Sequence, residues 1–337
     1  MAGGSAKAVY AAIGANSVIT MTKLGAFFMT GSGAMLSEGI HSAADVMNQS
    51  MLAFGIKQSS KTATNDLPYG YGRDAFVWAL ISAVGIFFLG CGVTLYHGIH
   101  SLLHPESVEL TDISIAAGVL IFSFVLEAWT LWVAFKAVQA SAQQMKMSFG
   151  AYLKEGPDPM AVAVLLEDAA AVTGVMVAGA SIGLFVLTGN PIWDAIGSLL
   201  IALLLGAVAV FLVIKNRKAL LGQAVTENLT SDVMAVLETE PAIESIHDVK
   251  ATIMGAEHFR FKAELDFDGR VIAKQWLAQN DLAATYAKAT ESQEAFETFL
   301  CTFGEHLCEA LGDEVDRIEA RVRTSVPAAK HLDLEVE

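Results

Sequence analysis

Six long apolar stretches constrain the fold of this chain more than any other feature of its sequence. They cover residues 8–30, 33–56, 75–102, 112–138, 159–188 and 191–216. As a helix, each is long enough to cross a hydrocarbon layer about 30 Å thick. Charged residues make up only 17% of the chain, against about a quarter in a typical soluble protein. We therefore expect an integral, multi-pass membrane protein.

Charge divides the chain into two parts. Residues 1–218, which contain the six stretches, carry a formal charge of −2, and residues 219–337 carry −13. The second part shows helical, alternating, alternating, helical and alternating patterns in that order, with its first helix expected to begin at Thr230 or Ser231. The expected fold is an all-α six-helix transmembrane bundle (1–218) followed by a C-terminal cytoplasmic α+β domain (219–337). So acidic a domain repels nucleic acid and attracts cations.

Basic residues are distributed unevenly among the connections between the stretches. Residues 30–33, 97–112 and 188–191 contain no Lys or Arg, whereas the connections on the opposite side and the segment after the last stretch contain several. The positive-inside rule therefore places both termini in the cytoplasm. The N-terminus shows neither a cleavable signal nor an Arg-rich presequence. On that ground we expect a bacterial plasma membrane in preference to a mitochondrial inner membrane.

Ionisable residues inside the second and fifth stretches are the candidates for function. His41 and Asp45 stand four residues apart, so they share one face of a helix. Glu167 and Asp168 form an acidic pair in the fifth stretch. Such residues are costly inside a bilayer and are usually found facing a cavity, a partner or an ion. Imidazole and carboxylate groups together suit Zn²⁺, although a hydrogen-bond network that only locks helices together is an alternative.

Other intramembrane charges have less specific surroundings. Glu38 precedes His41 by three residues, and Glu127 lies in the middle of the fourth stretch. Both are candidates for a proton or metal relay. The alternatives are a helix-positioning role for Glu38, and an interhelical ion pair or hydrogen bond for Glu127, with Lys23 as its candidate partner.

Several motifs together resemble the cation diffusion facilitator family, and more narrowly its zinc transporter nine-like, mitochondrial-type branch. The resemblance extends over nearly the whole chain. The segments that carry it are residues 31–45 (GSGAMLSEGIHSAAD), 67–73 (LPYGYGR), 165–172 (LLEDAAAV), 193–198 (WDAIGS), 246–252 (IHDVKAT), 260–270 (RFKAELDFDGR) and 331–335 (HLDLE).

The resemblance implies a homodimeric antiporter that exports Zn²⁺ in exchange for protons and has a ferredoxin-like cytoplasmic domain. In that family the second and fifth spans each supply two metal ligands, four residues apart. His41 and Asp45 fit the first pair, and Asp168 fits one position of the second. The other position falls on Val164, which cannot bind a metal. The resemblance therefore leaves the site one ligand short, to be completed by water, by Glu167 or by another acid.

The expected function is accordingly proton-coupled efflux of a divalent metal, most simply zinc. The metal ligands are expected to be His41, Asp45, Asp168 and Glu167. Metal and protons are cargo and counter-ion, so no cofactor and no catalytic residue is expected, and the partners are the lipid bilayer, the metal and a second copy of the chain. Alternatives are selectivity for Mn²⁺, Fe²⁺, Co²⁺ or Cd²⁺, an intramembrane metallohydrolase and a non-transporting membrane scaffold.

Two further groups of histidines fall outside the expected transport site. His97, His100 and His104 are spaced three and four residues apart near the end of the third stretch. They form either a metal-release patch or an ordinary interfacial face. In the acidic domain, histidines 247, 258 and 331 lie on expected strands among acids. They form either a regulatory metal site or ordinary strand polarity.

Overall fold

The computed structural model describes residues 2–30, 33–104, 110–145, 147–190, 192–256 and 258–337. For residues 2–5, 30, 33–38, 40 and 110–116 it describes the backbone alone. The chain forms two compact units. Unit 1 comprises Met1–Gln223 and Gly255–Glu257, and unit 2 comprises Ala224–Met254 and His258–Glu337.

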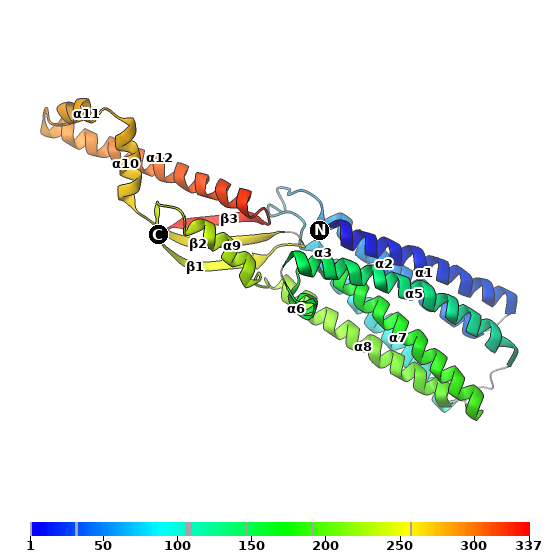
Figure 1. The fold of residues 1–337 in the computed structure, drawn as a ribbon. Helices are drawn as coiled ribbons and strands as arrows, with labels where there is room; N and C mark the ends of the chain where they lie inside the picture. The colour runs from blue at the N-terminus through cyan, green and yellow to red at the C-terminus, as the bar shows by residue number, and fades with distance from the viewer. Residues whose placement is uncertain (1, 31–32, 105–109, 146, 191, 257) are drawn as a thin grey trace. The chain divides into compact units, whose positions relative to one another are not determined.

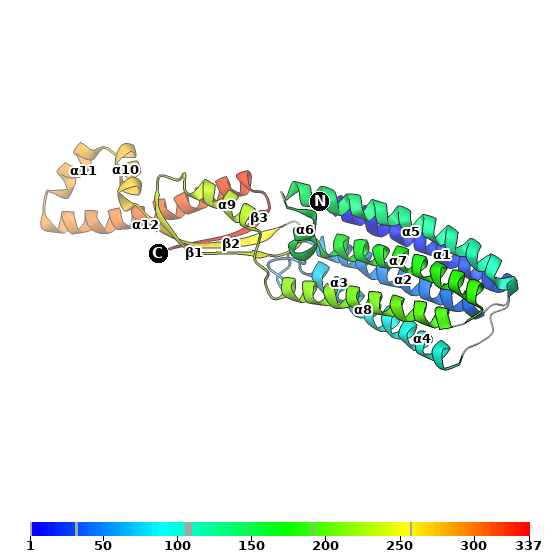
Figure 2. The ribbon, with the colours of Figure 1, turned by 60° about the horizontal axis from the view of Figure 1, so that its bottom comes forward.

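Long helices run side by side through unit 1 (Figures 1 and 2). They are α1 (Ala2–Thr30), α2 (Gly33–Ser59), α3 (Asp74–Gly85), α4 (Val93–Leu103), α5 (Leu110–Gln144), α7 (Pro159–Thr188) and α8 (Ile192–Leu220), with a short α6 (Phe149–Glu155) before α7. Within the described residues, four helical segments are long and apolar enough to cross a membrane: Asp74–Leu103, Ala117–Gln144, Pro159–Thr188 and Ile192–Leu220. A bundle of apolar helices is therefore confirmed, while the six spans stay a prediction.

The third apolar stretch is not one uniform α-helix. Between α3 and α4 the backbone forms a π-helix, η1 (Ile86–Gly92), which the apolar pattern did not reveal. Glycines bring this segment close to α8: a side chain at Gly90 would touch Leu205, and a Cβ at Gly206 would lie 3.0 Å from Cys91 Sγ. π-helical turns are short local features within α-helices. Hydropathy alone therefore predicts the third apolar stretch as a helix but not the π-helical segment within it.

Residue types at its two ends define helix α7, which carries the acidic pair. Asp158 caps the first turn, accepting hydrogen bonds from the backbone amides of Met160 and Ala161, both at 3.1 Å. Pro159 fits the first helical position, where no intrahelical amide bond is needed. At the other end Gly189 adopts φ = 67°, the left-handed conformation that terminates many helices. These signals fix the register in which α7 presents Glu167 and Asp168.

One part of the bundle is tightly packed. Its apolar cluster includes Leu52 of α2, Ala79 of α3 and every side chain from Met160 to Leu165 of α7. Helices approach closely at Gly55, where an added Cβ would lie 2.4 Å from Met160 Cε and 2.6 Å from Trp78 Cβ. The last turns of α2 and the first turns of α7 therefore meet in a densely packed apolar region.

Unit 2 is built on a three-stranded sheet in the order β1-β2-β3. The strands are β1 (Ile243–Ile253), β2 (Phe259–Phe267) and β3 (Ala329–Val336), with β1 antiparallel and β3 parallel to β2. Helix α9 (Glu227–Leu237) and the C-terminal half of α12 (Gln293–Ser325) cover one face (Figure 2). The expected order helix, strand, strand, helix, strand is present, although α9 begins three residues before the expected Thr230 cap.

The two faces of the sheet differ in chemistry because side chains alternate along each strand. Phe259, Phe261 and Leu265 point to the helices and form the core of unit 2. The opposite face carries ion pairs across the strands, including Arg260 with Asp333 and Lys262 with Glu335. This charged face accounts for part of the acidic and basic residues that the sequence places on the strands.

The second helical pattern of residues 219–337 is in fact three helices. Besides α12, the structure has α10 (Gly269–Gln279) and α11 (Leu282–Ala289). Each of the three begins with a side-chain cap: Asp268 caps α10, Asp281 caps α11 and Ser292 caps α12. Such caps favour helix starts. The three capping residues are visible in the sequence, and they divide a helical pattern that composition alone predicts to be continuous.

Candidate metal centre

Helix α2 places the first expected ligand pair on one face. His41 Nε2 lies 3.9 Å from Asp45 Oδ2, and each side chain is 34% exposed. The two residues are one helical turn apart, so their side chains project in nearly the same direction. An imidazole nitrogen and a carboxylate at this spacing can bind one metal ion together.

Helix α7 brings the acidic pair to the same place. Glu167 and Asp168 are both buried, and each interacts electrostatically with Asp45 of α2. The structure therefore unites acids that lie more than 120 residues apart in the sequence. Carboxylates at close range in an apolar bundle repel one another unless protons or a cation neutralise them. This arrangement is suited to binding either.

Glu127 belongs to the same cluster. Its side chain is buried in α5 and interacts electrostatically with Asp168. The sequence offered Lys23 as a candidate partner, and the structure gives for Lys23 a hydrogen bond of 2.9 Å to the hydroxyl of Ser42. The side chain of Glu38, the other expected relay residue, lies outside the described residues. The roles of both acids stay predictions.

Val164 is fully buried in the apolar cluster of unit 1. Its surroundings are those of a core residue, in agreement with its inability to bind metal. Three residues further along α7, Glu167 accepts a hydrogen bond of 3.0 Å from Asn48 Nδ2. Glu167 thus stands beside the acid cluster with one of its oxygens held by α2.

Sequence reasoning missed two polar neighbours of Asp45. Asn48 and Gln49 follow it by one turn and both are buried; for Gln49, neither side-chain amide atom has a hydrogen-bond partner in the described part of the chain. The signal was available, because polar residues three and four positions after Asp45 fall near its helix face within an apolar stretch. The partner of Asn48 comes from the distant helix α7 and could not be predicted from spacing.

Two of the three histidines near the end of the third stretch lie next to one another, His100 in α4 and His104 directly after it. The rings of His100 and His104 are stacked at 4.8 Å, and Tyr96 lies 6.0 Å from His100. Aromatic stacking alone accounts for this arrangement, so a metal-release patch stays a prediction.

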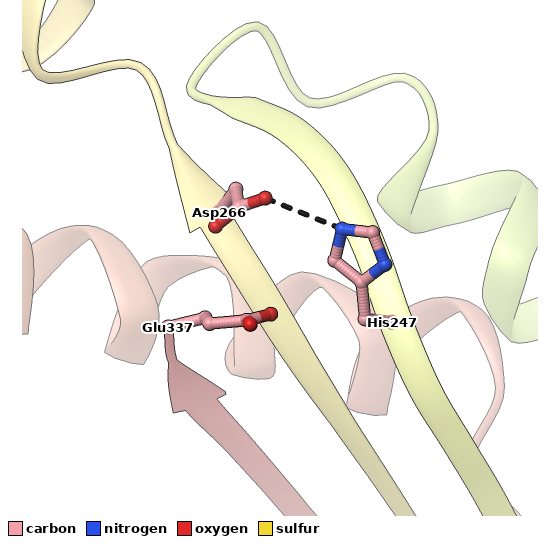
Figure 3. Close-up of side chains that lie close together, drawn as sticks. All are labelled: His247, Asp266 and Glu337. Carbon is pink, nitrogen blue, oxygen red and sulfur yellow. Dashed lines mark hydrogen bonds and ion pairs between the residues drawn. The ribbon is translucent and has the colours of Figure 1, made fainter.

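In unit 2, three side chains that can bind metal come together on the sheet (Figure 3). His247 of β1 lies 3.2 Å from Asp266 of β2, and a carboxylate oxygen of Glu337 completes a group whose atoms all lie within 4.8 Å of one another. Hydrogen bonds from Ser245 and His247 lower the pKa of Asp266. Histidines 258 and 331, expected nearby, are not members of this group. A regulatory metal site here stays a prediction.

Comparison with known proteins decides the family. Residues 9–221 match the cation efflux transmembrane domain. The chain belongs to the cation efflux family. Membership confirms the resemblance to cation diffusion facilitators of the zinc transporter nine-like branch, and it agrees with the expectation of a membrane transporter rather than an enzyme.

Individual members of the cation efflux family are similar over almost the whole chain. The mitochondrial proton-coupled zinc antiporter SLC30A9 of Xenopus laevis is 42% identical over 335 residues, which is 99% of this chain and 60% of that protein. Its human counterpart is 41% identical over 99% of this chain and 59% of that protein. Metal tolerance protein C4 of Arabidopsis thaliana is 38% identical over 98% of this chain and 73% of that protein. The chain thus spans about 60% of the length of the two zinc antiporters.

These relatives overturn one expectation. The bacterial plasma membrane predicted from the sequence is wrong, because the SLC30A9 proteins of Xenopus laevis, human, Pongo abelii and Mus musculus are mitochondrial by name. The prediction rested on the lack of a presequence. That argument carries no weight for a chain that matches only part of longer proteins. The multi-pass membrane character of this cation efflux protein stands.

Proposed function

We propose that this protein is a proton-coupled antiporter that exports a divalent metal, Zn²⁺ in particular, across a mitochondrial membrane. The observation that carries the proposal is the meeting of His41 and Asp45 on α2 with Glu167 and Asp168 on α7, where Asp45 interacts electrostatically with both acids of the other helix. The relatives that are named zinc antiporters support the choice of ion and counter-ion.

The ligand chemistry supports zinc. One imidazole and several carboxylates are good ligands for Zn²⁺, which tolerates distorted four-coordinate sites without sulfur. The same donors accept Mn²⁺, Fe²⁺, Co²⁺ and Cd²⁺. A competition experiment among these ions is therefore part of any test of selectivity.

Coupling to protons follows from the ligands themselves. Each must be deprotonated before it binds metal, so metal and protons compete for the same lone pairs. Export requires that the site open alternately to the two sides of the membrane. His41 and Asp45 remain 34% exposed, while Leu52 of α2 and Met160 of α7 are buried. The packed region therefore closes the site toward the end of α2, and parting α2 from α7 there would open it.

Zinc flux into vesicles tests the proposal. The full-length protein is reconstituted into liposomes that contain a zinc-sensitive dye, with a pH gradient of either sign. We expect zinc uptake that depends on the proton gradient and is abolished by His41→Ala and by Asp45→Ala, each of which removes a ligand. His306→Ala, at an exposed histidine of α12, serves as the matched control and should transport normally. Undiminished flux in both site variants would overturn the proposed site.

A further inference from the structure

The hydrogen bond between Asn48 and Glu167 links the two helices that carry the metal ligands. Asn48 Nδ2 donates to Glu167 Oε1 at 3.0 Å, and both side chains are more than nine-tenths buried. A hydrogen bond to a charged acceptor is stronger than one between neutral groups. In a bundle of low polarity, neither buried group can form a hydrogen bond to water instead, which favours this pairing further.

Asn48 lies between α7 and the end of α3. A Cβ at Gly85 would be 3.6 Å from Asn48 Oδ1, so the amide oxygen faces the backbone of that glycine. This oxygen is buried and accepts no hydrogen bond within the described residues. The amide therefore has its donor side turned to Glu167 and its acceptor side left unsatisfied, at a cost in free energy.

The two carboxylate oxygens of Glu167 likewise differ in their hydrogen bonding. Its Oε1 is held by Asn48, while Oε2 is buried and has no hydrogen-bond partner in the part of the chain that the structure describes. The charged groups that act on Glu167 are those of Asp45 and Asp168. One oxygen is thus fixed in place and the other is available beside two acids expected to bind metal.

A purely structural link does not account for this pattern. Packing between α2 and α7 is already provided by Gly55 against Met160. Buried polar groups that only lock helices together are normally fully hydrogen-bonded, because each unsatisfied atom costs free energy. Here both partners of one interhelical hydrogen bond, Asn48 and Glu167, keep an unsatisfied oxygen within the described residues. Among the same residues, Asn216 of α8 also has an unsatisfied amide oxygen, but its amide donates within its own helix and so links no helices.

We propose that Asn48 is a positioning residue for metal binding: it fixes Glu167 so that Glu167 Oε2 takes the ligand position that Val164 cannot fill. Asn48 itself binds no metal in this arrangement and acts through Glu167. The inference rests on the proposed function, because it assigns the fourth ligand of that same site. It also explains why an amide rather than an apolar side chain stands one turn after Asp45 in an apolar helix.

A double-mutant cycle on zinc affinity tests this role. Zinc binding to the purified full-length protein is measured by competition with a fluorescent chelator, with His247→Ala in every variant so that unit 2 cannot contribute through that histidine. Asn48→Leu preserves the size of the side chain and removes the donor to Glu167. Asn48→Ser shortens the side chain and so withdraws its donor from Glu167. Glu167→Gln removes the charge of the ligand. The matched control is Asn216→Leu, because Asn216 of α8 is also fully buried but donates to Leu212 of its own helix at 2.8 Å.

The expected result is a rise in the zinc Kd of about tenfold for both Asn48 variants, the size of effect that a hydrogen bond to a charged group has. Asn216→Leu should change the Kd by less than about twofold, and Asn48→Leu combined with Glu167→Gln should bind no more weakly than Glu167→Gln alone. Asn48→Gln, which keeps a donor, should recover part of the affinity. A merely structural role would not show this non-additivity or this recovery.

Two results would overturn the inference. The first is an Asn48→Leu variant that binds zinc as well as Asn216→Leu does, and the second is an additive loss in the double variant. Failure of the proposed function looks different, because wild-type vesicles would then accumulate no zinc whatever the effect of Asn48 on binding.

Discussion

Val164 and Glu167 lie one turn apart on α7 and have opposite surroundings. Val164 is enclosed by apolar side chains, whereas Glu167 faces Asn48 and two other acids. The spacing of the family that the chain resembles falls on position 164, four residues before Asp168, and the structure makes that position part of the core. Residue spacing within a helix therefore places His41 and Asp45 on one face, but it does not predict a matching pair on α7.

Replacing Val164 by histidine should accordingly damage the fold rather than complete the metal site. A buried imidazole without hydrogen-bond partners costs about 1–3 kcal/mol, so we expect Val164→His to lower the midpoint of thermal unfolding in detergent. Val186→His, at an exposed position of the same helix, is the control and should unfold near the wild-type temperature. A Val164→His protein that keeps wild-type stability and binds zinc more tightly would show that position 164 is open to the site.

Sequence patterns predict some features of the individual helices and not others. Apolar length and caps predict where α7 begins and ends, because those signals are local. They do not predict the π-helix η1, the division into α10, α11 and α12, or the hydrogen bond between Asn48 and Glu167, whose residues are 119 positions apart. The π-helix and the hydrogen bond depend on contacts between distant elements, which a local pattern does not contain. The division into three helices was indicated locally by the caps at Asp281 and Ser292, but the apolar pattern favoured one continuous helix.

Close packing of α2 against α3 and α7 gives a prediction at the scale of elements. A methyl group at Gly55 would come within 2.6 Å of Trp78 Cβ, which cannot move without its helix. We expect Gly55→Ala to destabilise the protein by about 1–3 kcal/mol, as overpacking does. The control is Gly14→Ala on α1, where an added Cβ meets nothing within 4 Å; it should be neutral or slightly stabilising. Equal unfolding midpoints for the two variants would show that this contact is loose.

On the scale of the whole molecule, the division of charge has a structural counterpart. Most of the acidic excess of the chain falls within unit 2, where arginines of α12 hold some of the acids. Glu240 is almost fully buried and pairs with Arg317 and with Arg321, the latter at 2.6 Å. An acidic unit of this kind would raise the concentration of cations near it. Charge counting predicted that two parts exist; it could not predict which acids are neutralised within them.

Unit 2 should lose stability in acid. Hydrogen bonds from Arg317 lower the pKa of Glu314 below its ordinary value of 4.5. The unfolded chain then binds a proton at higher pH than the folded chain, so this contribution to stability is complete above pH 4.5 and is lost as pH falls through the lower folded pKa. The protection factors of β2 amides, which are exchange rates corrected for the intrinsic effect of pH, should fall over that range in hydrogen–deuterium exchange of the full-length protein.

A matched pair of variants isolates this contribution. Glu314→Gln should make the protection factors of β2 less sensitive to acid, while Glu305→Gln, at an exposed position of the same helix, should leave their pH dependence as in the wild type. If Glu314→Gln and the wild type respond to acid identically, the ion pair with Arg317 contributes nothing measurable.

We propose that one metal ion binds between α2 and α7, and a structure of the full-length protein with zinc would show this site directly. Anomalous scattering at the zinc edge locates the ion without assumptions about its ligands. The account predicts zinc at about 2.0–2.2 Å from the imidazole of His41 and from oxygens of Asp45, Asp168 and Glu167. An ion bound elsewhere in unit 1, or a site between these helices that lacks Asp45 and Asp168 as ligands, would contradict it.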